Sequence, residues 1–369
     1  MLADKYNRTK IIGIGVVVWS IFTGISGLAK NFITLAIPRA FLGVGESSIT
    51  PTTMSILTDR LETKKLGFAA GIYYMGVPLG VAVSLIFAGY LGPTIGWRNS
   101  LFLIAGIGLV LGALMLFVKD TPRKVVLQGS NKQSFSETLI LLFKALKNSK
   151  SLILTILAGT LYHVVLGASV FDQVWATEDK GFDRASFAQA SGWIFAFFGL
   201  AGSVFGGSFS DWTLKKYNLP RTWFVLILTL VTIPFALTRY LDPSDNFYLF
   251  WSGVCVSAFS LGCFYGPMFA VIQELVPSNI RGTIVGFYLV CLNLLGYVPG
   301  SAIAGIVIEY LKDTNVHIVS HINDIDTAIP YTHTLVGFSV MFMIIGPILY
   351  FYAGKFYEND RKELIKRFG

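Results

Sequence analysis

The sequence places a carboxylate and a guanidinium inside one long apolar run, where charge is costly. The run extends from Phe32 to Leu57, and Glu46 lies about 14 residues into it, which is roughly 20 Å along a helix. A carboxylate at membrane depth must face a cavity, pair with a cation or take up a proton. Glu46 is therefore a candidate residue for proton exchange.

Arg39 lies seven residues before Glu46, which is nearly two turns of an α-helix, so both side chains share one face. Two turns separate their backbones by about 10 Å, so the two residues can line a polar surface without touching. In that arrangement Arg39 would hold an anionic headgroup or carboxylate while Glu46 exchanges protons. The alternative is a structural pair of Glu46 with Arg39 or with a backbone group of a neighbouring helix.

Three further polar residues are candidates to line a cavity. His163 lies inside another apolar run, and an imidazole with an unperturbed pKa of about 6.5 suits a second protonation site. A hydrogen-bonded structural histidine is the alternative. Tyr73 and Asn293 bring a hydroxyl and an amide into apolar runs, although aromatic residues also serve as packing or interface anchors.

The sequence carries no pattern typical of a metal centre or of an enzyme. Its three cysteines lie in apolar runs, and its four histidines pair at metal-ligand spacing neither with each other nor with a cysteine. A membrane enzyme would need a catalytic cluster at the bilayer surface, and no nucleophile or paired-carboxylate arrangement is present. We therefore expect no catalytic residues, no metal, no cofactor and no enzymatic activity.

The composition indicates which elements must position these residues. The chain has 369 residues, of which 54% are hydrophobic and only 14% charged, whereas soluble domains carry about 25% charged residues. A membrane-spanning helix takes roughly 20 apolar residues, so this length holds on the order of ten spans. The sequence therefore predicts an all-α polytopic membrane protein. The predicted spans are Ile11–Ala29, Phe32–Leu57, Phe68–Leu91, Ser100–Val118, Leu152–Ala176, Ser186–Phe209, Thr222–Thr238, Phe247–Leu275, Gly282–Ile308 and His333–Ala353.

The distribution of basic residues predicts the orientation of the spans. Of the 29 Lys and Arg residues, 22 lie in alternate polar stretches, beginning with the first, and in the C-terminal tail. Basic residues remain on the cytoplasmic side, so we expect both termini and the long connection 119–150 inside a plasma or inner membrane. The net charge of +8 is then a topology signal. We accordingly expect a lipid bilayer, and no nucleic acid, as a partner.

The long connection divides the chain into groups of four and six spans. We expect an N-terminal bundle over 1–118, a cytoplasmic linker over 119–150, a C-terminal bundle over 151–355 and a tail over 356–369. Within the linker, Ser134 and Glu137 have capping-box spacing before a run that mixes leucines with lysines. This pattern favours an amphipathic helix on the inner membrane face, and the alternative is that it begins the next span.

An internal repeat relates the two groups of spans. Pro51 and Pro267 are related by an offset of 216 residues, and so are the basic residues 14 positions after each. Two related halves that meet at the membrane midplane are typical of secondary transporters. Two spans precede Asp211 in the second half, whereas the corresponding Asp4 stands at the start of the chain. By symmetry we expect twelve helices in a complete version, of which the first two are absent.

Three motifs, in the right order, resemble those of the major facilitator superfamily. The resemblance covers essentially the whole chain and implies a major facilitator fold with ten of its twelve helices. The sequence around Glu46 and Pro78 is similar to that of the spinster-type lipid transporters in particular. The matching residues are Asp4, Lys5 and Arg8 in a loop motif, Arg39, Gly43 and Gly45 in an R-x-x-x-G-x-G motif, and Gly71, Gly76, Pro78 and Gly80 in a glycine-proline motif.

The resemblance also implies roles for these motifs. Asp4 and Asp211 would gate the cytoplasmic side, each pairing with Lys or Arg and with a helix N-terminus across the two bundles. An ordinary solvated loop acid is the alternative for both. The glycine-proline motif would allow close helix approach and a bend, with packing without motion as the alternative.

We therefore expect a secondary active transporter that works by alternating access. The preferred substrate is a lipid-like or amphiphilic anion, coupled to protons through Glu46. Symporters of small organic anions have a similar Gly-Glu helix, so such an anion is the alternative substrate. A further alternative is a non-transporting remnant, because the first bundle would lack two helices and the site partners that they carry.

Overall fold

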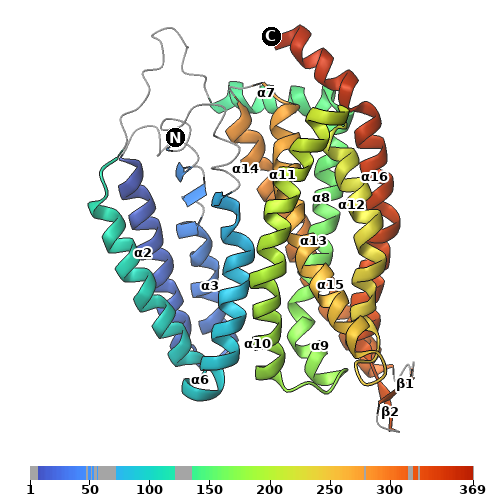
Figure 1. Ribbon diagram of the computed structural model, residues 1–369. Helices are drawn as coiled ribbons and strands as arrows, with labels where there is room; N and C mark the ends of the chain where they lie inside the picture. Colours follow the sequence, from blue (N-terminus) through green and yellow to red (C-terminus); the bar gives the residue numbers. More distant parts are fainter. Residues whose placement is uncertain are drawn as a thin grey trace. The chain divides into compact units, whose positions relative to one another are not determined.

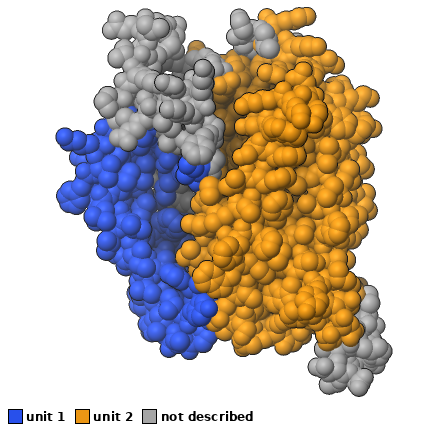
Figure 2. All heavy atoms as spheres, viewed as in Figure 1, with its two compact units in different colours: residues 1–73, 84–132 blue, residues 74–83, 133–369 orange. Residues whose placement is uncertain are grey.

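Helices form most of the chain that the structure describes (Figure 1). The computed structural model describes residues 7–46, 49–50, 52–53, 56, 72–120, 135–277, 280–314, 319–322 and 325–368. Two compact units are distinguished, and Figure 2 colours them separately. Unit 1 comprises residues 1–73 and 84–132, and unit 2 comprises residues 74–83 and 133–369.

Unit 1 contains α2 (Arg8–Gly27), α3 (Phe32–Glu46) and most of α6 (Gly76–Phe117). Asn7 caps α2, because its Oδ1 accepts a hydrogen bond from the Lys10 amide at 2.9 Å. The helix packs along α3. The first two predicted spans are therefore neighbours in unit 1.

Two predicted spans are joined in α6. The backbone leaves the helical conformation at Gly96, where φ is 78° and ψ is 158°. A positive φ favours glycine, because glycine has no Cβ, and Gly96 therefore turns the chain between the predicted spans. Arg98 then donates from Nη2 to the Ala29 carbonyl at 2.9 Å, just beyond the end of α2.

Unit 2 contains the six predicted C-terminal spans and the helix that precedes them. The elements are α7 (Phe135–Asn148), α8 (Lys150–Ala168), the 3₁₀ helix Ser169–Phe171, α9 (Asp172–Glu178), α10 (Arg184–Ile194), the π-helix Phe195–Gly199, α11 (Leu200–Tyr217), α12 (Arg221–Ala236), the 3₁₀ helix Leu237–Tyr240, α13 (Phe247–Glu274), α14 (Arg281–Val290), the π-helix Cys291–Tyr297, α15 (Val298–Asp313), β1 (Val319–Ile322), β2 (Ile325–Ala328) and α16 (Pro330–Phe368). Two of the spans contain a π-helical segment. A third, α8, continues through a short 3₁₀ helix into α9, and a fourth, α12, ends in a 3₁₀ helix.

The larger of two buried clusters in unit 2 includes side chains from α8, α12, α13, α14 and α16. Leu152, Met268, Ile284 and Tyr350 are fully buried in it. Small residues allow the helices to approach closely. A methyl group at Gly296, for example, would lie 2.7 Å from the Thr160 carbonyl oxygen. Such packing is what holds helices together in a bilayer, where lipid is as apolar as the side chains.

The helical membrane fold is confirmed. Eight helices of the described chain are long and apolar enough to cross a membrane, and one of them, Ile72–Phe117, holds two predicted spans. A shorter apolar helix, Phe32–Gly43, accounts for another. Some helices run further than predicted: α11 ends only at Tyr217, where Asn218 adopts a left-handed conformation. Charged residues favour helix as well as apolar residues do, so the end of an apolar run does not mark the end of a helix.

Three regular elements lie between the predicted spans or extend beyond them. α7 is a separate helix, because it ends at Asn148 and Ser149 caps α8 by accepting from the Leu152 amide. β1 and β2 form an antiparallel ribbon in the connection between α15 and α16. α16 continues through the predicted tail 356–369 as far as Phe368.

Candidate functional site

Arg39 and Glu46 both lie on α3, which is helical throughout the interval between them. This continuity places the two residues nearly two turns apart, as the spacing predicts. Arg39 is exposed. The side chain of Glu46 lies outside the description, so its exchange of protons stays a prediction.

Arg8, the arginine of the loop motif, is buried in an ion pair within unit 1. Its Nε lies 3.2 Å from Asp120 Oδ1, and its backbone amide donates to Asp120 Oδ2 at 2.8 Å. Asp120 therefore compensates the charge of Arg8 and also satisfies an amide in the first turn of α2. Asp4 and Lys5 lie outside the described residues, so the gate stays a prediction.

Asp211 lies in the last turns of α11 and pairs with the first residue of α12. Arg221 Nη2 lies 2.6 Å from Asp211 Oδ1, and Arg221 Nη1 donates to Glu274 at the end of α13. The hydroxyl of Tyr357, on α16, donates to the other oxygen of Glu274. One guanidinium thus links the ends of three helices, and Tyr357 adds a fourth. The pairing of Asp211 across the two bundles stays a prediction.

The described part of the glycine-proline motif lies at the start of α6. The helix is interrupted at Met75, because Pro78 has no amide to donate to the carbonyl of Tyr74 four residues earlier. Pro78 is buried, whereas Gly76 and Gly80 are exposed and a methyl group at either would meet open space among the described residues. Gly71 lies outside the described residues. The hinge role stays a prediction.

The candidate cavity residues make local hydrogen bonds. His163 is buried, with Nδ1 3.0 Å from the Gly159 carbonyl oxygen and Nε2 3.3 Å from the Tyr265 hydroxyl. This geometry favours the structural alternative for His163, because both ring nitrogens have partners. Asn293 is exposed and donates to the Leu289 carbonyl at 2.9 Å. Tyr73, in unit 1, hydrogen-bonds the Thr50 hydroxyl at 2.8 Å.

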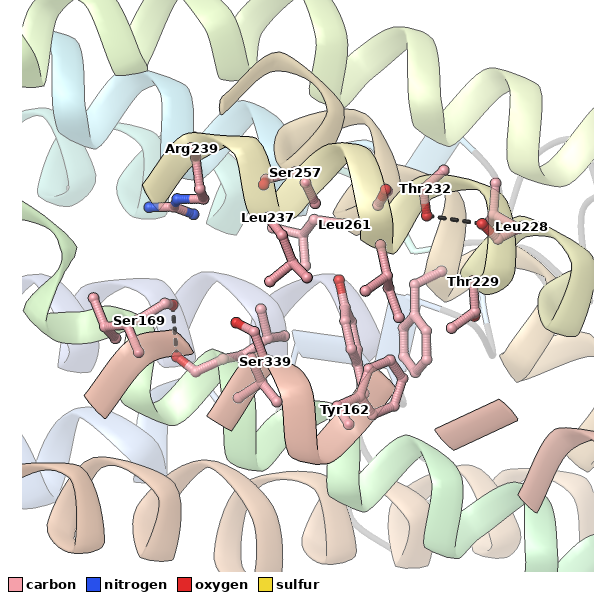
Figure 3. Close-up of a pocket in the computed structure, with 18 of the residues that line it drawn as sticks. Tyr162, Ser169, Leu228, Thr229, Thr232, Leu237, Arg239, Ser257, Leu261 and Ser339 are labelled. Atoms are coloured by element: carbon pink, nitrogen blue, oxygen red, sulfur yellow. Dashed lines mark hydrogen bonds between the residues drawn. The ribbon is translucent and has the colours of Figure 1, made fainter. Parts of the chain in front are cut away.

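Unit 2 contains a cavity of about 160 Å³, lined by α8, α12, α13 and α16 (Figure 3). Aliphatic side chains form most of its wall, together with the rings of Tyr162, Phe264 and Phe342. The ring centroids of Phe264 and Phe342 lie 4.4 Å and 5.2 Å from that of Tyr162. In Figure 3, Arg239 lies at one end of the cavity and Thr229 at the other. Hydroxyls interrupt the apolar wall at Ser169, Thr229, Thr232, Ser257, Ser260 and Ser339.

The charged end of this cavity was missed in the sequence. Asp172, which begins α9, accepts from Arg239 with an Nη2–Oδ2 distance of 2.7 Å, and their side chains are 24% and 13% exposed. The guanidinium also lies 5.1 Å from the centroid of the Trp175 ring, within range of a cation–π interaction. Asp172 falls inside the predicted span Leu152–Ala176. The cost of an intramembrane carboxylate, which singled out Glu46, was therefore a signal for Asp172 as well.

Two charged residues just after α9 form hydrogen bonds with the start of α16 and with the 3₁₀ helix after α12. Asp179 Oδ2 accepts from the Thr332 amide at 2.6 Å, and Lys180 Nζ donates to the Tyr240 carbonyl at 2.9 Å. Burial raises the pKa of the Asp179 carboxyl, while the Thr332 bonds and the Lys180 charge oppose the rise. Burial lowers the pKa of the Lys180 amine. Both charges are therefore held at an energetic cost.

Asp179 should make the stability of the fold depend on pH with a defined sign. Because its pKa is raised in the folded state, the folded state binds the proton more tightly, and the free energy of unfolding falls as pH rises through the folded-state pKa. Asp179→Asn removes this dependence. We therefore expect the Tm of this variant, measured from about pH 4 upward, to rise relative to that of the wild type as pH increases.

Asp183→Asn is the matched control, with the opposite sign. The Asp183 carboxylate caps α10 by accepting from the Ser186 amide and hydroxyl, both at 2.8 Å, and these bonds lower its pKa. The stability that ionised Asp183 contributes is gained as pH rises from its lowered folded-state pKa to the unfolded value of about 4. In profiles extended below pH 4, this variant should therefore lose Tm relative to the wild type as pH increases. Parallel pH profiles for Asp179→Asn and the wild type would contradict the role of burial at Asp179.

Comparisons with a family profile and with known sequences agree in relating this chain to membrane transporters. A family profile described as Major Facilitator Superfamily matches residues 1–301. The chain is 28% identical to the probable sphingolipid transporter spinster homolog 1 of Arabidopsis thaliana, over 85% of this chain and 68% of that protein. It is 27% identical to the hexuronate transporter of Bacillus subtilis, over 83% of this chain and 74% of that protein.

A solved structure is similar in fold. It is the crystal structure of a bacterial homolog of the human lysosomal transporter Spinster, in an inward-facing and unoccupied conformation. The TM-score is 0.73 at 24% sequence identity, and the match covers 98% of this chain and 85% of that chain. At this identity the likeness concerns the fold alone.

Proposed function

Because the chain belongs to the Major Facilitator Superfamily and is a multi-pass membrane transporter, we propose that it carries a lipid-like or amphiphilic anion by alternating access. The observation that carries this proposal is the relation to Arabidopsis spinster homolog 1, which extends over 85% of the chain. Arg39 supports it, because a cation within the apolar run of α3 would hold an anionic headgroup where bare charge is costly.

Proton coupling and gating complete the proposal. Glu46, which lies on the same face of α3 as Arg39 and nearly two turns from it, takes up and releases the coupled proton. Asp4, Lys5 and Arg8 form one half of the cytoplasmic gate, and Asp211 belongs to the other. Both termini lie on the cytoplasmic side of a plasma or inner membrane, which the positive-inside distribution of Lys and Arg supports.

A small organic anion is the second candidate substrate. The relation to the hexuronate transporter of Bacillus subtilis, at 27% identity over 83% of the chain, favours it. Arg39 suits both classes, because a guanidinium binds a carboxylate as readily as a phosphate. The two candidates differ in the apolar body of the substrate, which only the first requires.

Uptake into proteoliposomes distinguishes the candidates. The purified chain is reconstituted, a pH gradient is imposed, and uptake of a labelled anionic lysolipid is compared with uptake of labelled hexuronate. We expect lysolipid uptake that excess unlabelled lysolipid inhibits and excess hexuronate does not. The reverse pattern would establish the organic-anion alternative, and no uptake of either compound would favour the non-transporting remnant.

Arg39→Ala tests the anion-binding role in the same assay. Removing a charge-assisted hydrogen bond costs about 1.5–3 kcal/mol, so we expect the apparent affinity to fall by about tenfold or more. Lys30→Ala is the matched control, because Lys30 is an exposed basic residue just before α3. Equal transport by both variants would remove Arg39 from the proposed site.

A further inference from the structure

The cavity of unit 2 has room for a single ring. Its volume of about 160 Å³ is close to that of an engineered protein cavity of about 150 Å³ that binds benzene. Leu166 and Leu261 form part of the wall, and Phe264 and Phe342 offer ring faces and edges against which an aromatic ligand packs. An apolar body of about six carbon atoms therefore fits in this space.

The charged end supplies one donor and one acceptor that lack partners. The ion pair uses Arg239 Nη2 and Asp172 Oδ2. Arg239 Nε and Asp172 Oδ1 are buried, and neither has a hydrogen-bond partner among the residues that the structure describes. Buried polar atoms are costly to leave unpaired, so a bound group that both donates and accepts would stabilise this end.

The remaining wall selects against charged ligands. Thr229, Thr232 and Ser257 donate their hydroxyl protons to carbonyls one turn earlier in their own helices, at 2.7–2.8 Å. Their oxygens keep lone pairs as acceptors, which would repel an anion. The charges of Asp172 and Arg239 compensate each other, so no net charge remains to offset the desolvation of an added cation or anion.

We propose that this cavity binds a small uncharged aromatic alcohol or phenol. The ring lies against the apolar wall, and the hydroxyl lies at the charged end, where a shift of the Asp172 and Arg239 side chains lets it donate to Asp172 Oδ1 and accept from Arg239 Nε. The site lies entirely within unit 2. Because it is assigned from the cavity alone, it does not depend on which substrate the protein transports, and its test measures binding rather than transport.

Ligand-observed fluorine NMR of para-fluorobenzyl alcohol with the full chain in lipid nanodiscs tests the proposal. We expect saturable line broadening that unlabelled benzyl alcohol reverses and that benzoate and benzylamine do not. Para-fluorotoluene lacks the hydroxyl and should bind about tenfold more weakly, because hydrogen bonds to charged groups contribute at least that factor. Empty nanodiscs report the background from partition into lipid.

Two substitutions on α13 form a matched pair. Ser260 lines the cavity and Ser252 is exposed, and each donates its hydroxyl to a carbonyl of the same helix. Ser260→Phe fills the cavity and should abolish saturable binding, whereas Ser252→Phe should leave it unchanged. Thr229→Leu is the milder second variant, in case the first does not fold, and should weaken binding about tenfold.

The proposal is overturned by any of three results. Wild-type protein without saturable binding would mean that the cavity holds only water. Binding that survives both Ser260→Phe and Thr229→Leu would place the ligand elsewhere. Equal binding of benzoate would show that Asp172 and the wall oxygens do not exclude anions.

Discussion

Glu46→Gln is expected to reduce uptake driven by a pH gradient by about 100-fold, which is what one positioned acid–base group contributes to proton transfer. Glutamine keeps the size of the side chain but neither takes up nor releases a proton, so it resembles a permanently neutral carboxyl. Exchange of substrate at equal pH on both sides should therefore continue. Proteoliposome uptake against an imposed pH difference, beside counterflow at equal pH, measures both quantities.

Glu178→Gln is the control for this variant. Glu178 is an exposed acid at the end of α9, and its substitution by glutamine removes the same charge from the chain. It should leave both uptake and counterflow unchanged. If uptake by Glu46→Gln keeps the pH dependence of the wild type, Glu46 is not the proton carrier. A loss of thermal stability in that variant would then favour the structural pair with Arg39.

The helices were predictable from the sequence because membrane depth imposes a strong constraint. Every stretch within the bilayer must satisfy its backbone internally, so an apolar run of span length has helix as its only regular form. The constraint ends at the membrane surface. The helices therefore continue beyond the predicted apolar runs, α11 to Tyr217 and α16 to Phe368. It also says nothing about the ribbon of β1 and β2, whose pairing is outside any predicted span.

The interruptions within the spans were predictable only in part. Pro78 indicates a break, and the interruption at Met75 lies within one turn of it. Gly96 gave no such signal, because glycine is common in membrane helices and only its backbone angles distinguish a turn from a packing contact. The π-helical segment that contains Gly296 likewise has no sequence signature that we recognised.

Residue types for the sites were predictable, but their partners were not. Arg8 was identified by a motif, yet Asp120, which binds it, lies 112 residues away in the chain. Likewise, the sequence around Asp211 gave no indication that Arg221 binds both Asp211 and Glu274. Ion pairs of this kind depend on tertiary packing, which spacing along one helix does not report.

Asp172→Ala is expected to lower the free energy of unfolding by about 3 kcal/mol, because it leaves the buried Arg239 charge without its partner. Asp172→Leu with Arg239→Met replaces both charges by apolar groups of similar volume and should restore most of the loss, since such replacements are often neutral. Thermal unfolding in detergent measures both, with Asp183→Asn, an exposed acid at the cap of α10, as a control of small effect. If the double variant is as unstable as Asp172→Ala, the loss comes from packing around the cavity. If it recovers, the ion pair is dispensable for folding, and an intramembrane pair retained without benefit to stability serves the cavity that it closes.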